Sequence, residues 1–206
     1  MIAVRRIVAF AAPLAVLALI LGTTSALAGG EHGRSAADDT SSMAGMPDMP
    51  GMHDMRTDSV PGSALKPYRA LAAPFKRAAP AGYGAITDNQ GISCIADPGG
   101  TGAMGIHFVN PDVLTDGQLD PDHPEAFVYA PGPAGKLVAL EYIVFKDAWD
   151  TTHSGPPELF PGHPFMTTGA PNRFDLPAFY SQHVWIGRGN PHGNLAMWNP
   201  AVHCPS

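Results

Sequence analysis

The pattern of apolar and polar positions divides this chain into three parts. Residues 7–21 form one continuous apolar run, residues 29–62 contain no aromatic residue, and from residue 91 onward short apolar runs alternate with stretches that contain Gly and Pro. Short apolar runs bounded by turn residues are typical of buried strands. The pattern therefore predicts one strand-rich globular domain over residues 63–206, preceded by two segments that lie outside its core.

Five apolar runs predict strands, and the longest of them spans residues 136–145. This run is apolar at nearly every position, which indicates a central strand that is covered on both faces of a sheet. Asn110 followed by Pro111 is a turn signal that ends one of the other runs. The remaining four predicted strands cover residues 91–95, 103–109, 126–129 and 183–186.

Helical periodicity is confined to residues 63–80, where Pro67 and Pro74 interrupt it. An interior proline removes a hydrogen bond and clashes with the preceding turn, so we expect one kinked helix or two short ones. Residues 147–178 are rich in Pro and Gly and predict a long ordered loop, a kind of segment that is often functional. The expected fold class is α+β and sheet-dominated, with an antiparallel sheet or open barrel, one or two short N-terminal helices and long Pro/Gly-rich loops.

The composition excludes several classes of protein. The chain contains 23 Gly and 22 Pro among 206 residues, too many for the long uninterrupted helices of a helix bundle or a coiled coil. Acidic residues outnumber basic ones by 18 to 12, and the formal net charge is −6. Nucleic-acid binding requires basic patches, so we expect no nucleic-acid partner.

Residues 1–28 have the features of a cleaved signal peptide. Arg5 and Arg6 precede the apolar run, and the sequence Ala-Leu-Ala ending at Ala28 offers small residues at a cleavage site. The alternative is an N-terminal membrane anchor, for which the run is short. No later apolar stretch approaches 18 residues. We therefore expect a secreted or periplasmic protein with no stable membrane insertion after cleavage.

Cys94 and Cys204 are the two cysteines of the chain. The cysteines of an exported protein meet an oxidising compartment, where a pair most simply forms one disulfide. Such a bond would tie the start of the folded region to its last residues. The alternative is a metal site with two thiolates, although the CxxC spacing typical of such sites is missing.

Residues 29–62 are predicted to be a linker that is disordered without a ligand, because they cannot bury enough apolar surface to offset their ordering entropy. Five methionines in it recur at every third position, a spacing that matches polyproline II and would place all the thioethers along one edge. Thioethers are soft ligands that select Cu(I). The alternatives are an inert linker and a buffer against oxidants. The candidate copper ligands of this Met-rich arm are Met43, Met46, Met49, Met52, His53 and Met55.

Three polar residues interrupt apolar runs of the domain, namely His107, Glu141 and His183. A buried carboxylate must be paired, hydrogen-bonded or neutralised. If the sheet brings the three residues together, they could bind Zn, Cu or Fe with an open coordination position, or perform acid–base chemistry. The alternatives are a hydrogen-bond network that fixes the register of the sheet, or three side chains that never meet. Glu125 is another candidate carboxylate, expected on a solvated face or turn.

Several segments of the domain resemble a group of exported bacterial proteins of unknown activity. They read MGIHFVNP from Met104, GKLVALEY from Gly135, and HVW from His183 followed by NP-x-G and WNP-x-x-x-C. The first two segments are also distantly similar to a domain family named after a Thermus protein. The resemblance implies an exported domain in which His107, Glu141 and His183 occupy matched positions, and it implies no activity. The Met-rich arm resembles the Met-rich segments of exported bacterial copper-handling proteins.

Together these observations favour an exported metal-binding protein that captures or buffers copper. The alternatives are a small-ligand-binding or enzymatic domain that uses His107, Glu141 and His183, and a structural envelope protein without a metal. The chain contains no nucleophile elbow, phosphate-binding loop, dinucleotide fingerprint or HExxH motif. The sequence leaves open whether the protein is an enzyme, which metal it uses and how many copies assemble.

Overall fold

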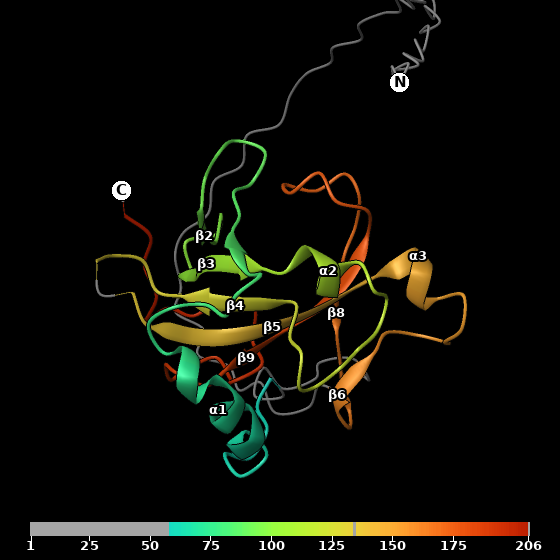
Figure 1. Ribbon diagram of the computed structural model, residues 1–206, viewed down its shortest axis with the longest axis horizontal. Helices are drawn as coiled ribbons and strands as arrows, with labels where there is room; N and C mark the ends of the chain where they lie inside the picture. Colours follow the sequence, from blue (N-terminus) through green and yellow to red (C-terminus); the bar gives the residue numbers. More distant parts are fainter. Residues whose placement is uncertain (1–57, 134, 206) are drawn as a thin grey trace, which may run out of the picture. The chain divides into compact units, whose positions relative to one another are not determined.

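The computed structural model describes residues 58–133 and 135–205. Its main element is a seven-stranded antiparallel sheet with the strand order β1-β3-β4-β5-β9-β8, and β2 also pairs with β3 (Figure 1). Over these residues the sheet is open, so the antiparallel sheet is confirmed and the barrel is not. The strands are β1 (Gly84–Ala85), β2 (Cys94–Ala96), β3 (Ala103–Val109), β4 (Ala126–Tyr129), β5 (Leu137–Phe145), β8 (Met166–Thr168) and β9 (Phe179–Trp185).

Three predicted strands coincide almost residue for residue with β3, β4 and β5. Eight of the nine residues of β5 are buried, and β4 and β9 flank it, which confirms a central strand covered on both faces. The prediction for the last strand is wrong at its start, because β9 begins at Phe179 rather than at residue 183. Ser181 and Gln182 are polar and made this part look like a loop, yet both are buried and pair with β5.

The segment 147–178 contains more regular structure than the predicted loop. Besides β8 it holds most of α3 (Lys146–Trp149) and a separate two-stranded sheet of β6 (Glu158–Phe160) and β7 (His163–Pro164). Strands of two or three residues are too short to produce an apolar periodicity that can be recognised in a sequence. The Pro/Gly-rich composition therefore predicted the connections correctly and missed the short strands between them.

The helical part of the domain is two short pieces, α1 (Lys66–Ala72) and the 3-10 turn η1 (Ala73–Phe75). Pro67 and Pro74 lie at the starts of these pieces, where the missing N–H of a proline is not needed for a helical hydrogen bond. The two prolines thus divide the predicted helix into two short pieces, which is one of the two expected forms. One further helical turn, α2 (Pro111–Leu114), follows β3 and is capped by the side chain of Asn110.

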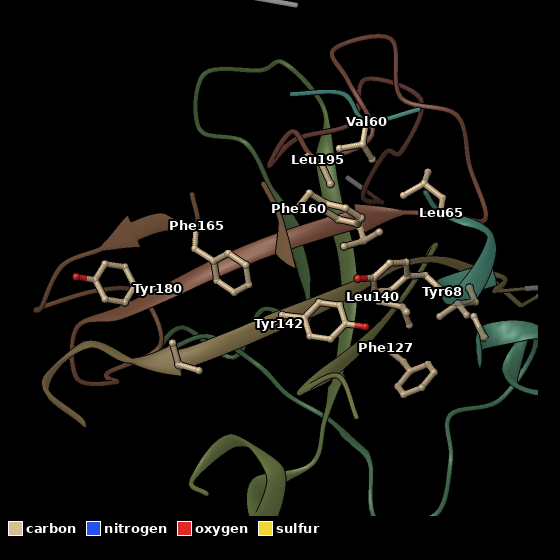
Figure 2. Close-up of a cluster of buried hydrophobic side chains, with 14 of the residues drawn as sticks. Val60, Leu65, Tyr68, Phe127, Leu140, Tyr142, Phe160, Phe165, Tyr180 and Leu195 are labelled. Carbon is tan, nitrogen blue, oxygen red and sulfur yellow. The ribbon is translucent and has the colours of Figure 1, made fainter. Parts of the chain in front are cut away.

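One face of the sheet, which we call the core face, carries the main apolar core. Alternate residues of β4, β5 and β9, among them Phe127, Leu140, Tyr142 and Val184, pack against Tyr68 of α1 and its neighbours. Figure 2 shows Tyr142 and Tyr68 among these side chains, and their rings meet edge to face with centroids 6.0 Å apart. Burial of these large side chains is the main source of stability on this face.

We call the opposite face the site face. Val128 and Trp185 form a second, smaller cluster there with Val202 of the C-terminal segment. The disulfide between Cys94 and Cys204 joins β2 to that segment across 110 residues and confirms the predicted pairing. A covalent bond therefore helps to hold the C-terminal segment against the site face.

Residues 58–62, which the sequence analysis placed in the linker, contact the domain. The N–H of Val60 donates to Asn194 Oδ1 at 2.9 Å, and the carbonyl of Val60 accepts from Asn194 Nδ2 at 2.8 Å. The N–H of Leu195 donates to the carbonyl of Asp58 at 2.7 Å. Val60 also belongs to the core, so a shortened protein that keeps this domain intact should retain Asp58 and all residues after it.

Candidate metal centre

His107, Glu141 and His183 lie on the site face, each on a different strand. Glu141 of β5 pairs directly with His183 of β9. Directly opposed residues of antiparallel strands project from the same face with Cβ atoms about 5 Å apart, so these two side chains are neighbours by register. His107 of β3 pairs with Val128 of β4, and β4 separates it from Glu141.

The side chains of β4 on the site face leave room for His107 to reach across that strand. Ala126 of β4 lies directly opposite Glu141 and is fully buried, and the next β4 residue on this face is Val128. Neither side chain is long, and Ala126 ends at Cβ. The imidazole of His107 can therefore lie over β4 and approach Glu141, which a larger residue at position 126 would prevent.

The three side chains meet in one cluster, which we call the His/Glu/His triad. His107 Nε2 lies 3.2 Å from Glu141 Oε2 and 3.3 Å from His183 Nε2. His183 Nδ1 faces Glu141 Oε1 at 3.7 Å. One ligand atom from each residue lies within 4.8 Å of the other two, and the three residues are 2–6% exposed. Of the arrangements that the sequence left open, the structure shows the one in which all three converge.

Two of the distances in the triad match the spacing of ligand atoms around a tetrahedral metal ion. Two ligand atoms that each lie about 2.0–2.1 Å from such an ion are about 3.3–3.4 Å apart. The separations of 3.2 Å and 3.3 Å at His107 Nε2 are close to that length. Two histidines and one carboxylate leave a fourth position for another ligand, as in catalytic zinc sites with the same ligand set.

Burial and neighbouring charges set the protonation of the triad. Burial lowers the pKa of His183 to about 4, so its imidazole is neutral at neutral pH and keeps a lone pair for a ligand bond. Burial alone would raise the pKa of Glu141, but positive charge on the neighbouring His183 and His107 outweighs it and brings the pKa of Glu141 to about 2. The carboxylate thus depends on a positive charge that a neutral His183 does not supply. A metal ion between the side chains would supply it.

Hydrogen bonding leaves the triad short of protons. When the ring proton of His183 is on Nδ1, which faces Glu141, its Nε2 lone pair faces His107 Nε2. His107 Nε2 carries one proton at most. Two acceptors, Glu141 Oε2 and His183 Nε2, lie at nearly equal distances from it. His107 Nδ1 is buried and has no hydrogen-bond partner among the described residues. A single proton cannot satisfy the lone pairs of His107 Nε2, Glu141 Oε2 and His183 Nε2 together. A cation bound between these atoms would satisfy all three.

A pocket of about 190 Å³ opens beside the triad. His107 and Glu141 line it, whereas His183 is not among its lining residues. Nine of the fourteen lining residues are apolar, and Thr87, Thr168 and Ser181 add hydroxyl groups. A mostly apolar pocket with a few converging polar groups is the usual form of a small-molecule site.

Two thioethers on the pocket wall, those of Met104 and Met197, were missed in the sequence analysis. Met104 is an extra residue of β3 relative to β2, so the normal two-residue alternation fails there. Gly105 allows this bulge with a positive φ of 116°, and a Cβ at Gly105 would lie 2.5 Å from the Tyr129 carbonyl oxygen. The available signal was the glycine next to Met104 inside an apolar run.

Glu125 corrects one expectation of the sequence analysis, because it is 1% exposed rather than solvated. Its Oε2 accepts a hydrogen bond from the N–H of Ile143 at 2.8 Å, just beyond the last residue pair of β4 and β5. Its Oε1 has no hydrogen-bond partner within the described part of the chain. Burial raises the pKa of Glu125 to about 8, so this carboxyl group is protonated at neutral pH.

The remaining predicted site residues lie outside the described residues. These are the ligands of the Met-rich arm, together with the predicted signal peptide and its cleavage site. Nothing in the structure bears on them.

Comparisons with known proteins find no matching family model, no similar curated protein and no similar solved structure. In the described part of the chain, no helix is long and apolar enough to cross a membrane. The functional assignment therefore rests on the geometry of the triad and on the pocket beside it.

Proposed function

We propose that this protein binds a metal ion at the His/Glu/His triad. One observation carries the proposal: Glu141 is a buried carboxylate with no lysine or arginine partner among the described residues, and it lies between two histidines, with His107 Nε2 at 3.2 Å and His183 Nδ1 at 3.7 Å from its oxygens. Holding an unpaired charge away from water is costly, and a bound cation removes that cost. The same group of side chains offers three ligand atoms and leaves one position open.

Copper is the metal that we propose, and its capture or buffering is the proposed role. In this proposal the Met-rich arm takes up Cu(I) and the triad is a second site. Imidazole and carboxylate ligands suit Cu(II), whereas thioethers suit Cu(I). Met104 and Met197 support the choice of a soft metal, because they place two thioethers on the wall of the pocket that His107 and Glu141 also line.

Export to a secreted or periplasmic location is also part of the proposal, as in the exported bacterial proteins that the domain resembles. The disulfide between Cys94 and Cys204 supports it, because such bonds persist in oxidising compartments. Sequencing the N-terminus of the protein isolated from its cells tests this point. We expect the chain to begin at Gly29, and a chain that still begins at Met1 would contradict export with cleavage.

Titration of the full chain with Cu(I) and with Cu(II), each in competition with a chelator, tests the two proposed sites separately. We expect Glu141→Gln to weaken Cu(II) binding at least tenfold, because the charged ligand is lost while the size of the side chain is kept. Replacement of the five arm methionines by leucine should weaken Cu(I) binding and leave the triad site intact.

Glu158→Gln is the matched control for Glu141→Gln, because Glu158 is exposed and lies outside the triad. Equal Cu(II) affinity of Glu141→Gln and the unchanged protein would rule out the triad as the metal site. Unaltered Cu(I) binding by the leucine variant would rule out the arm. If Glu141→Gln instead unfolds the protein in the absence of metal, the triad is the register-fixing network that the sequence left as an alternative.

A further inference from the structure

The pocket beside the triad is larger than a metal ion requires. Its volume is about 190 Å³. A dry apolar cavity of about 150 Å³ in another protein is large enough to bind benzene. The pocket therefore has room for one aromatic ring with a small substituent.

The open side of the triad faces this pocket. His107 and Glu141 line it, and His183 lies behind them, paired with Glu141 across β5 and β9. An ion held by the three side chains would be closed off by His183 on one side. Its free coordination position would then point past His107 and Glu141 into the pocket. Ser181, two residues before His183 in β9, adds a hydroxyl group to the same wall.

Part of the apolar wall is only half-buried. Leu114, Phe174, Leu176 and Met197 each line the pocket and each keep part of their side chain exposed. A bound apolar molecule would remove this surface from water, which is favourable in proportion to the area covered. The four residues come from segments far apart in the sequence, so the fold gathers them at this place.

We propose that the pocket binds a molecule with a single aromatic ring, or an apolar group of that size, which carries one carboxylate or similar anionic oxygen donor. The ring would occupy the apolar part, and the anionic oxygen would fill the open position of the metal ion. This inference rests on the proposed metal function. A divalent ion held by two neutral histidines and one carboxylate keeps a positive charge that attracts the anion. The metal-free site lacks this positive charge and offers the anion no coordination position.

Binding of benzoate and of acetate to the full chain tests the proposal, since the two anions share a carboxylate and differ in the ring. Calorimetric titrations are made with the protein loaded with Cu(II) and with the metal-free protein, after the copper content has been measured. We expect benzoate to bind the loaded protein at least tenfold more tightly than acetate does. The metal-free protein should bind benzoate at least tenfold more weakly than the loaded protein.

Two variants that fill the pocket locate the binding site, Leu176→Trp and Leu114→Trp. Both positions are half-buried, so each tolerates a larger side chain better than the core would. We expect each to reduce benzoate affinity at least tenfold while copper binds with unchanged stoichiometry. Ile92→Trp is the matched control, because Ile92 is 44% exposed and is not among the lining residues of the pocket.

The outcomes separate this inference from the proposed function. If copper binds at the triad but benzoate binds no more tightly than acetate, the ligand proposal is overturned and the metal function stands. The same holds if both tryptophan variants keep full benzoate affinity. If copper does not bind at the triad, the metal function fails, and the ligand proposal fails with it.

Discussion

The two faces of the central sheet use the same strands in different ways. On the core face, large side chains such as Phe127 and Tyr142 pack with α1 and its neighbours. On the site face, the alternate residues of those strands include the small Ala126 and the ionisable Glu141 and His183, and irregular segments contribute to the cover of this face. The contrast indicates that the core face stabilises the scaffold while the site face is free to hold the chemistry. Substitutions on the two faces should therefore separate stability from metal binding.

Two buried carboxyl groups show the same contrast on a smaller scale. Glu125 is buried beside the end of β4 and forms no ion pair with a histidine among the described residues, and burial raises its pKa to about 8. Glu141 is buried just as deeply, which alone would raise its pKa too, but positive charge on His183 and His107 brings that pKa to about 2. Burial by itself makes a carboxyl group neutral, so an ionised one requires a compensating charge. Only the carboxyl group of the site face has groups around it that can share a cation.

The largest effect should come from the core face. Phe127 is 2% exposed, and its ring contacts those of Phe75 and Tyr83 at centroid distances of 5.3 Å and 5.0 Å. Phe127→Ala is expected to lower the free energy of unfolding by about 3–5 kcal/mol, because it leaves a cavity among packed rings. Urea denaturation of the metal-free protein measures this loss.

Glu141→Gln is the comparison on the site face, where we expect a change within about 1 kcal/mol because the substitution removes a buried charge rather than packing volume. Below its unfolding transition, the Phe127→Ala protein should still bind Cu(II) like the unchanged protein. If Glu141→Gln were the more destabilising of the two, the assignment of stability to the core face would be wrong.

The next largest loss of stability should come from removing the disulfide on the site face. Replacing Cys94 and Cys204 together by serine should cost about 2–4 kcal/mol, because the bond closes a long loop and restricts the unfolded chain. The loss of local stability should be largest in the C-terminal segment, where Val202 packs on the site face. Hydrogen exchange compares the N–H of Val202, which donates to the Asn199 carbonyl at 3.0 Å, with amides of β5. Equal acceleration at both places would show that the disulfide does not act locally.

A smaller effect should follow from the pH dependence of Glu125. Its pKa rises from 4.5 in the unfolded chain to about 8 in the folded one, so between these values the folded state holds one more proton. Stability therefore falls as the pH rises through this window, by at most about 1.4 kcal/mol per pH unit and by about 2 kcal/mol between pH 6 and pH 8. Glu125→Gln should flatten this slope, as measured by urea denaturation at several pH values.

Glu158→Gln is the matched control for that series, since Glu158 is an exposed glutamate. Its pH slope should equal that of the unchanged protein. A slope that persists in Glu125→Gln would assign the pH dependence to another group.

The parts of the fold that could be predicted are those in which local sequence and tertiary environment agree. β3 to β5 are apolar runs that end at turn residues, so their bounds could be predicted closely. The start of β9 could not, because Ser181 is polar and is buried only through its pairing with Ile143. His107, Glu141 and His183 were recognisable as polar residues in apolar runs. Their convergence depends on strand order, and on the small Ala126 between them, which no local pattern reveals.

The pocket could not be predicted for a related reason. Met104 reaches it through a bulge, and Met197 arrives from a segment more than ninety positions further along the chain. Local periodicity describes neighbours a few residues apart and carries no information about such encounters. The polar end of the site is therefore recognisable in the sequence, and its apolar wall is not.

The smallest effect should come from an ion pair that joins two walls of the pocket. Arg173 Nη2 lies 2.7 Å from Asp88 Oδ2, and the N–H of Asn89 donates to the Arg173 carbonyl at 2.8 Å. These contacts connect the segment that carries Phe174 and Leu176 to the segment that follows β1. Hydrogen bonds from Arg173 and from the N–H of Ile92 hold the pKa of Asp88 below its usual value.

Arg173→Met keeps the apolar stem of the side chain and removes the guanidinium group. We expect faster hydrogen exchange at the N–H of Asn89, weaker binding of benzoate, and a change in the free energy of unfolding smaller than that of any variant above. The Arg173 guanidinium is partly exposed, and the buried Asp88 still accepts hydrogen bonds at Oδ1 from the N–H groups of Gln90 and Ile92. In the unchanged protein, the contribution of Asp88 is present above its usual pKa of 3.8 and is lost as the pH falls through its lower folded value. Arg188→Met, at an exposed position without a salt bridge among the described residues, serves as the control. A loss of stability in Arg173→Met as large as that of Phe127→Ala would mean that the irregular segments over the site face stabilise the fold as strongly as the core face does. The assignment of stability to the core face and of metal binding to the site face would then be wrong.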